Sequence, residues 1–153
     1  MQTLSLRYAQ KNRTGMVGRK GRQEVKAEIF RYVKEQYGIE PDYPFPSDPS
    51  IPVLRHPDNR KWFAIFLSVA GHRLGPDLDG QVEVINLKIG DPLLVDLLIR
   101  QSGFYRAYHM NHEKWISIVL NGTVPLSEIL RWTSESYGVT ASHIRKKERK
   151  KEK

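Results

Sequence analysis

The sequence predicts an α+β domain, in which an antiparallel sheet is built from hairpins and helices are packed on one face of that sheet. The predicted elements follow one another as helix, strand, strand, helix, strand, strand, helix. Strands and helices do not alternate one by one, as a doubly wound parallel sheet requires. The length of 153 residues fits a single domain with short extensions.

Residues 23–37 predict the first helix, and Gly38 follows where a left-handed cap residue belongs. Its apolar side chains recur at helical spacing: Val25, Ile29, Phe30, Val33 and Tyr37. Residues 39–57 contain six prolines. Because proline lacks an N–H group, this stretch predicts a loop with at most an edge segment, over residues 52–55.

Two hairpins follow from runs of aromatic and β-branched residues. Residues 61–69 and 81–89 predict the first, joined by a glycine-rich loop over 70–80, with the strand over 61–69 covered on both sides. Residues 104–108 and 115–121 predict the second.

The helices after the hairpins have clear beginnings. Asp91 is predicted to cap the first of them and Pro92 to open it. Its expected buried stripe is Leu94, Val95, Leu97 and Leu98, and it is expected to stop at Ser102 and Gly103. The next helix follows Pro125 and is expected to end at Gly138, with a shared apolar face: Leu126, Ile129, Leu130, Thr133 and Tyr137. A last short helix is predicted from Thr140 into the lysines.

The positive charge lies at the two ends of the chain. The net charge is +8, but residues 24–144 carry 12 basic against 15 acidic side chains. Residues 1–23 carry six basic side chains and no acidic one, and residues 145–153 carry seven basic and two acidic ones. We therefore divide the chain into a basic, mobile arm (1–22), one α+β domain (23–144) and a basic tail (145–153). Such tails either contact a polyanion or only keep a protein soluble.

Several function classes have no support in the sequence. With no cysteine, disulfides, thiolate metal sites and a cysteine nucleophile are excluded. No phosphate-binding glycine loop or nucleophile elbow occurs. His109 and His112 fit turn roles better than a metal site, and His56 beside Pro57 fits a tight turn. The sequence predicts no cofactor, no metal and no enzymatic activity. Without an apolar span or signal peptide, it predicts a cytoplasmic protein and no membrane partner.

The chain resembles the MmcQ/YjbR family. The resemblance rests on residues 37–45 and 53–64, on Asn86-Leu87-Lys88, on residues 103–111 and on the run from Lys114 to Pro125, and it covers roughly residues 23–139. It implies a compact double-wing α+β fold, similar in outline to frataxin-like sheets, in a small bacterial protein. Members are described as predicted DNA-binding proteins, a label that depends largely on fold, and there are no established catalytic residues to carry over.

The leading hypothesis is a non-enzymatic DNA-binding protein. Its phosphate contacts would come from the basic ends and a few cations of the body, several of which flank predicted strand starts. These predicted contact residues are Arg19, Lys20, Arg22, Arg55, Arg60, Lys61, Lys88, Arg106, Lys114, Arg145, Lys146 and Lys147.

The alternative is a protein or small-ligand interaction domain with an unknown partner. In that case residues 43–45, with Trp62 and Trp115, would line a groove. Each of these tryptophans follows a lysine at a predicted strand start, and a buried sheet aromatic is the favoured interpretation over a base-stacking platform.

Overall fold

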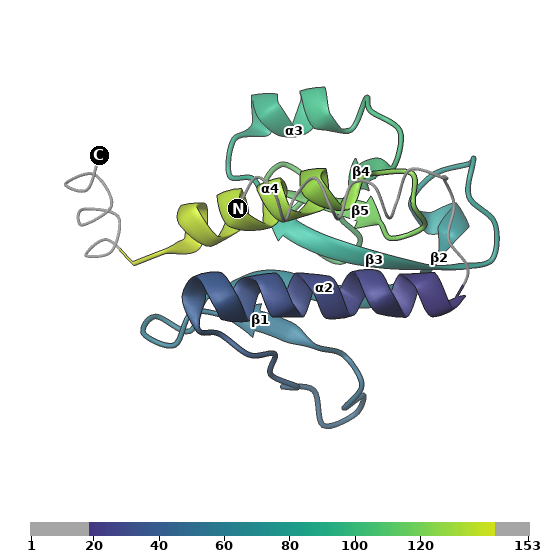
Figure 1. The fold of residues 1–153 in the computed structure, drawn as a ribbon. Coiled ribbons are helices and arrows are strands. Elements are labelled where there is room, and N and C mark those ends of the chain that lie inside the picture. The colour runs from purple at the N-terminus through teal and green to yellow at the C-terminus, as the bar shows by residue number, and fades with distance from the viewer. Residues whose placement is uncertain (1–18, 143–153) are drawn as a thin grey trace.

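The computed structural model describes residues 19–142 and has the predicted α+β architecture (Figure 1). Its helices are α2 (Arg19–Tyr37), α3 (Pro92–Leu98) and α4 (Leu126–Thr140), with a short 3-10 turn, η1 (Gly71–Arg73). Its strands are β1 (Val53–Arg55), β2 (Trp62–Ala70), β3 (Gln81–Lys88), β4 (Phe104–Arg106) and β5 (Trp115–Val119). They form one sheet in the order β1-β2-β3-β5-β4, and every neighbouring pair is antiparallel. Both predicted hairpins are confirmed.

One face of the sheet, here called the helix face, carries the main core. α2 and α4 lie side by side across it (Figure 1), and α4 contacts β2 and β3. The fully buried side chains Ile85 and Leu87 of β3 belong to one apolar cluster with Ile29 of α2 and Ile129 of α4. The side chains that alternate along β3 at a period of two therefore divide between this core and the opposite face.

The opposite face, here called the second face, has a smaller apolar cluster around Val69, Val84 and Val119. Leu74 and Leu78, from the loop after β2, cover this cluster. β2 is therefore buried on both sides, as its sequence predicts, although loops and not helices cover the second side.

Two polar side chains are fully buried on the second face. Ser117 donates a hydrogen bond to Asn86 Oδ1, and Asn86 Nδ2 donates to the Tyr108 carbonyl at 3.3 Å. Buried polar groups need such partners because an unmade hydrogen bond is costly away from water. This pair ties the segment after β4 to the centre of the sheet.

The start of α2 and the end of α4 differ from the sequence prediction. α2 begins at Arg19, so residues 19–22 are helical and do not belong to an arm. Basic residues are good helix formers, and one interior glycine costs only about 1 kcal/mol. α4 continues through Gly138 to Thr140. The predicted stop there is wrong because tertiary contacts hold the last turn: the Tyr137 ring stacks on Tyr37 with centroids 3.7 Å apart.

α3 begins as predicted, with Asp91 Oδ1 accepting a hydrogen bond from the Leu93 N–H at 3.0 Å. It ends at Leu98, before the expected stop. Val95 and Leu98 are buried, but Leu97 is 57% exposed and Leu93 is 75% exposed. The prediction that Leu97 lies in the buried stripe is wrong, because this short helix turns only one side toward the core (top of Figure 1).

Every helix between residues 19 and 142 is too short or too polar to cross a lipid bilayer.

Candidate nucleic-acid interface

The antiparallel topology brings the six predicted contact residues of the body to one end of the sheet. β1, β3 and β4 finish at this end, and β2 and β5 start there. Strand ends that meet in this way place their flanking residues next to one another. We call this region the cationic end and define it by Arg55, Arg60, Lys61, Lys88, Arg106 and Lys114.

The last turn of α4 lies at the same end, against the turn that joins β1 to β2 (left of Figure 1). His56 in that turn is fully buried, and its Nε2 lies 2.7 Å from Thr140 Oγ1. Asn59 Nδ2 donates to the Thr140 carbonyl at 3.0 Å. The chain therefore leaves its described part beside the cationic end, three residues before the basic tail begins.

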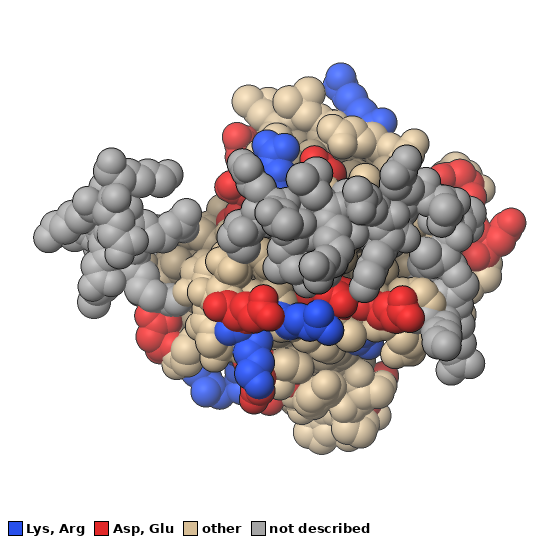
Figure 2. Space-filling view, viewed as in Figure 1, with Lys and Arg blue, Asp and Glu red and all other residues tan. Residues whose placement is uncertain are grey.

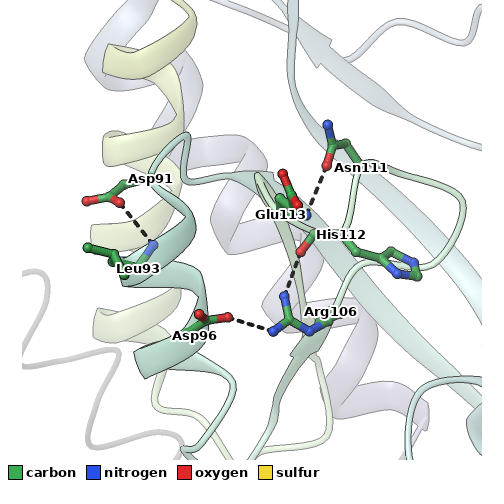
Figure 3. Close-up of polar contacts among 7 residues, drawn as sticks. All are labelled: Asp91, Leu93, Asp96, Arg106, Asn111, His112 and Glu113. Atoms are coloured by element: carbon green, nitrogen blue, oxygen red, sulfur yellow. Dashed lines mark hydrogen bonds and ion pairs between the residues drawn. The ribbon is translucent and has the colours of Figure 1, made fainter.

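Two cations of this end are paired with carboxylates. Arg55 forms an ion pair with Asp42, which lies in the loop before β1. Arg106 contacts Asp96 of α3 at 2.6 Å and also donates to the His112 carbonyl at 2.9 Å (Figure 3). Since one guanidinium joins α3 to the β4–β5 connection, Arg106 positions that connection as well as carrying charge.

Three other cations are open to a ligand. Arg60, Lys61 and Lys114 are exposed, and none forms an ion pair with another residue of the described region. The backbone around Arg60 is fixed by local bonds: its N–H donates to the His56 carbonyl at 3.0 Å. Such a turn presents adjacent basic side chains on a rigid support.

Lys88 is partly exposed at the end of β3, and its N–H donates to Ser136 Oγ of α4 at 2.9 Å. Six of the twelve predicted contact residues are thus brought together. For the rest, the backbone of residues 19–22 is in α2, while the side chains of Arg19, Lys20 and Arg22 lie outside the described residues. So do Arg145, Lys146 and Lys147.

The YjbR family model matches residues 34–139, which include the whole sheet and both ends of it. The chain belongs to the YjbR family.

Relatives of this YjbR family member share most of their length with it. The uncharacterised protein YyaQ of Bacillus subtilis (strain 168) is 39% identical over 116 residues, which is 76% of this chain and 98% of YyaQ. A crystal structure of a Pseudomonas syringae protein is 36% identical with a TM-score of 0.70, and covers 76% of this chain and 98% of that one. A Deinococcus radiodurans protein, 19% identical with a TM-score of 0.60 over 80% of this chain and 86% of its own, shows the fold alone.

Charge on the helix side of this YjbR protein is mixed. Figure 2 shows Lys and Arg interspersed with Asp and Glu there. Lys34 of α2 forms an exposed ion pair with Glu40 at 2.9 Å. Their mutual hydrogen bond raises the pKa of Lys34 and lowers the pKa of Glu40. Paired charges of opposite sign contribute little to long-range attraction of a polyanion.

The end of the sheet opposite the cationic end is acidic. A hollow of about 330 Å³ is lined there by Asp77, Asp79 and Glu83, over an apolar floor that includes Val82 and Val119. Among the described residues, no three histidine or acidic side chains are placed to hold a metal ion.

Tyr105 of β4, whose hydroxyl reaches Asp77 at this acidic end, gives a testable pH dependence. Burial, followed by the hydrogen bond from its hydroxyl to Asp77 Oδ2 at 2.7 Å, raises the pKa of Tyr105 to about 12. The folded protein then holds this proton more tightly than the unfolded chain, so the free energy of unfolding falls as pH rises from about 10 to about 12. Tyr105→Phe is expected to lose less stability over that interval. Urea unfolding of both proteins across the alkaline range measures this, and a constant difference between them would contradict it.

Proposed function

We propose that this YjbR family member is a non-enzymatic DNA-binding protein that contacts phosphates through the cationic end together with its two basic terminal segments. The observation that carries the proposal is the convergence of six cations at one end of the sheet, where three of them are exposed without an ion pair among the described residues. Exposed cations without an ion-pair partner in the described part of the chain are the groups that attract a phosphate backbone.

The position of the C-terminal segment supports the same proposal. α4 ends against the β1–β2 turn, and residues 145–153 then carry seven basic side chains. A basic segment tethered beside a cationic surface adds phosphate contacts at high local concentration.

The proposal predicts a strong salt dependence of binding to duplex DNA. If about six phosphate contacts form, log K is expected to fall with log salt at a slope of about −5. Deleting residues 1–18 and 145–153 keeps all of α2, including Arg19, Lys20 and Arg22, and leaves the cationic end intact. The shortened protein is expected to bind more weakly and with a shallower slope. A mobility-shift assay across a salt series measures both. A slope indistinguishable from zero for the full chain would refute DNA binding.

A protein-interaction domain is the second candidate, and the exposed apolar side of α3 favours it. Leu93 and Leu97 lie one helical turn apart and are 75% and 57% exposed. Neighbouring exposed leucines are a common feature of docking surfaces. If the cationic end is the functional surface, replacing both leucines by serine is expected to leave DNA affinity unchanged. If α3 is the functional surface, the same replacement is expected to abolish binding of the protein partner.

A further inference from the structure

Four side chains of alternating chemistry form a row across the sheet at the cationic end. Residues paired directly across antiparallel strands project from the same face. Arg55 of β1 pairs with Trp62 of β2, and Lys88 of β3 pairs with Trp115 of β5. We call Arg55, Trp62, Lys88 and Trp115 the cross-strand row.

The register places the whole row on the second face. Val53, Ile65, Asn86 and Ser117 are paired in sequence across β1, β2, β3 and β5, and Asn86 alternates with the helix-face residues Ile85 and Leu87. Residues two positions apart on a strand project from the same face, and the residues two positions closer to the cationic end lie on that face too. On β1, β3 and β5 those residues are Arg55, Lys88 and Trp115.

A β-bulge brings Trp62 into the row. The pairing register shifts between Leu54 and Arg55, so that Phe63 is left between the paired residues of β2. Phe63 is fully buried on the helix side, where its ring meets Tyr137 of α4 edge-on at 5.2 Å. An extra residue in one strand reverses the alternation. Strict alternation from Ala64 would instead have turned Trp62 toward the helix face.

The row is partly exposed and flanked by further charge. Trp62, Lys88 and Trp115 are all partly exposed, and the side chain of Arg55 is 24% exposed. The Phe45 ring packs edge-on against Trp62 at 5.5 Å. The exposed Lys61 and Lys114 directly precede the two tryptophans in the sequence.

Alternating cations and indole rings fit a nucleic acid whose bases are not already stacked on each other. Indole faces stack on unpaired bases, while ammonium groups such as that of Lys88 contact the phosphates between them. Trp62 and Trp115 lie on β2 and β5, with β3 between them, which leaves room for a separate base at each ring. The bases of a duplex are stacked inside it and cannot occupy these positions.

On this basis we propose that the ligand of the cationic end is a single strand of nucleic acid, with bases stacked on Trp62 and Trp115. The inference rests on the proposed nucleic-acid-binding function and specifies its ligand. In this inference the indoles of Trp62 and Trp115 bind bases and catalyse no reaction.

Tryptophan fluorescence tests the stacking directly. The chain has three tryptophans, and Trp132 of α4 is 8% exposed with its Nε1 donating to Glu128. In full-length W132F, a single-stranded oligothymidylate of about 15 nucleotides is expected to quench the emission of Trp62 and Trp115. In full-length W62F/W115F, which retains only Trp132, the same oligonucleotide is expected to leave the emission unchanged.

Affinity supplies the second readout. Fluorescence anisotropy of the labelled strand is expected to show binding at least about tenfold tighter than to a duplex of equal length, and Trp62→Leu or Trp115→Leu is expected to weaken single-strand binding about tenfold each. W132F serves as the matched control for affinity, and far-ultraviolet circular dichroism confirms that each variant is folded.

The outcomes separate the two proposals. Equal or tighter binding to the duplex, without quenching in W132F, would overturn the single-strand inference and leave DNA binding standing. Quenching that persists in W62F/W115F would overturn the assignment of the stacking residues. Absence of binding to either ligand at low salt would overturn both proposals.

Discussion

Reversing the charge of Arg60, Lys61 and Lys114 to glutamate is expected to weaken nucleic-acid binding by at least about a hundredfold at about 0.1 M salt. On duplex DNA, each lost phosphate contact removes about 0.9 from the slope of log K against log salt, so the slope is expected to become shallower by about 3. The effect is large because these three exposed cations have no ion pair with another described residue. A mobility-shift assay over a salt series measures the affinity and the slope together.

The control for this variant has the same change in net charge at other places. Lys26 of α2, Arg73 of η1 and Arg131 of α4 lie away from the cationic end, over the rings of Phe66, Tyr108 and Trp132 respectively. Reversing these three alters total charge equally, so a comparable loss of affinity in both variants would show that bulk charge, and not the arrangement at the strand ends, drives binding.

Ser136→Ala is expected to lower the free energy of unfolding by about 2 to 4 kcal/mol, because two backbone groups lose their partner at once. The Ser136 hydroxyl is fully buried; it donates to the Phe63 carbonyl at 2.6 Å and accepts from the Lys88 N–H at 2.9 Å. It thus bridges β2 and β3 at the point where their direct pairing has ended at Ala64 and Leu87. Urea unfolding followed by circular dichroism measures the change.

The size of that loss matters because single domains are stable by only about 5–15 kcal/mol. A fall in Tm of roughly 5 to 15 °C is expected with it. Ser127→Ala in the first turn of α4 is the matched control, since Ser127 is partly exposed and alanine is the better helix former. If Ser136→Ala were as stable as Ser127→Ala, the bridge between the strands would contribute nothing.

Much of this fold is encoded in local patterns. The spacing of Val25, Ile29 and Val33 predicts α2, and Asp91 followed by Pro92 predicts the start of α3, because side chains a few residues apart in sequence set both features. The same short-range information places cations such as Lys61 and Lys114 directly before strands. It also limits the prediction: the stacking of Tyr137 on Tyr37 overrides the local stop signal at Gly138, and the exposure of Leu97 depends on which side of α3 meets the core.

The candidate site depends on pairing between distant segments. Whether Trp62 and Trp115 share a face is decided by the register of β1 on β2 and by one bulge, and a one-residue slip would turn either ring to the other side. The sequence shows the lysine before each tryptophan, but it does not show from which face of the sheet the tryptophan projects. Likewise, the ion pairs of Arg55 with Asp42 and of Arg106 with Asp96 form only when the loop before β1 and helix α3 are in place.

From its sequence alone the chain can be divided into helices, hairpins and basic ends, because these depend on the periodicity of neighbouring residues and on their charge. The tertiary structure decides which cations meet, which are paired and which rings face solvent. Those properties depend on contacts between residues far apart in the chain, such as Ser136 with Phe63, 73 positions away. No local pattern carries that information, because strand register is set only when the sheet and the helices pack together.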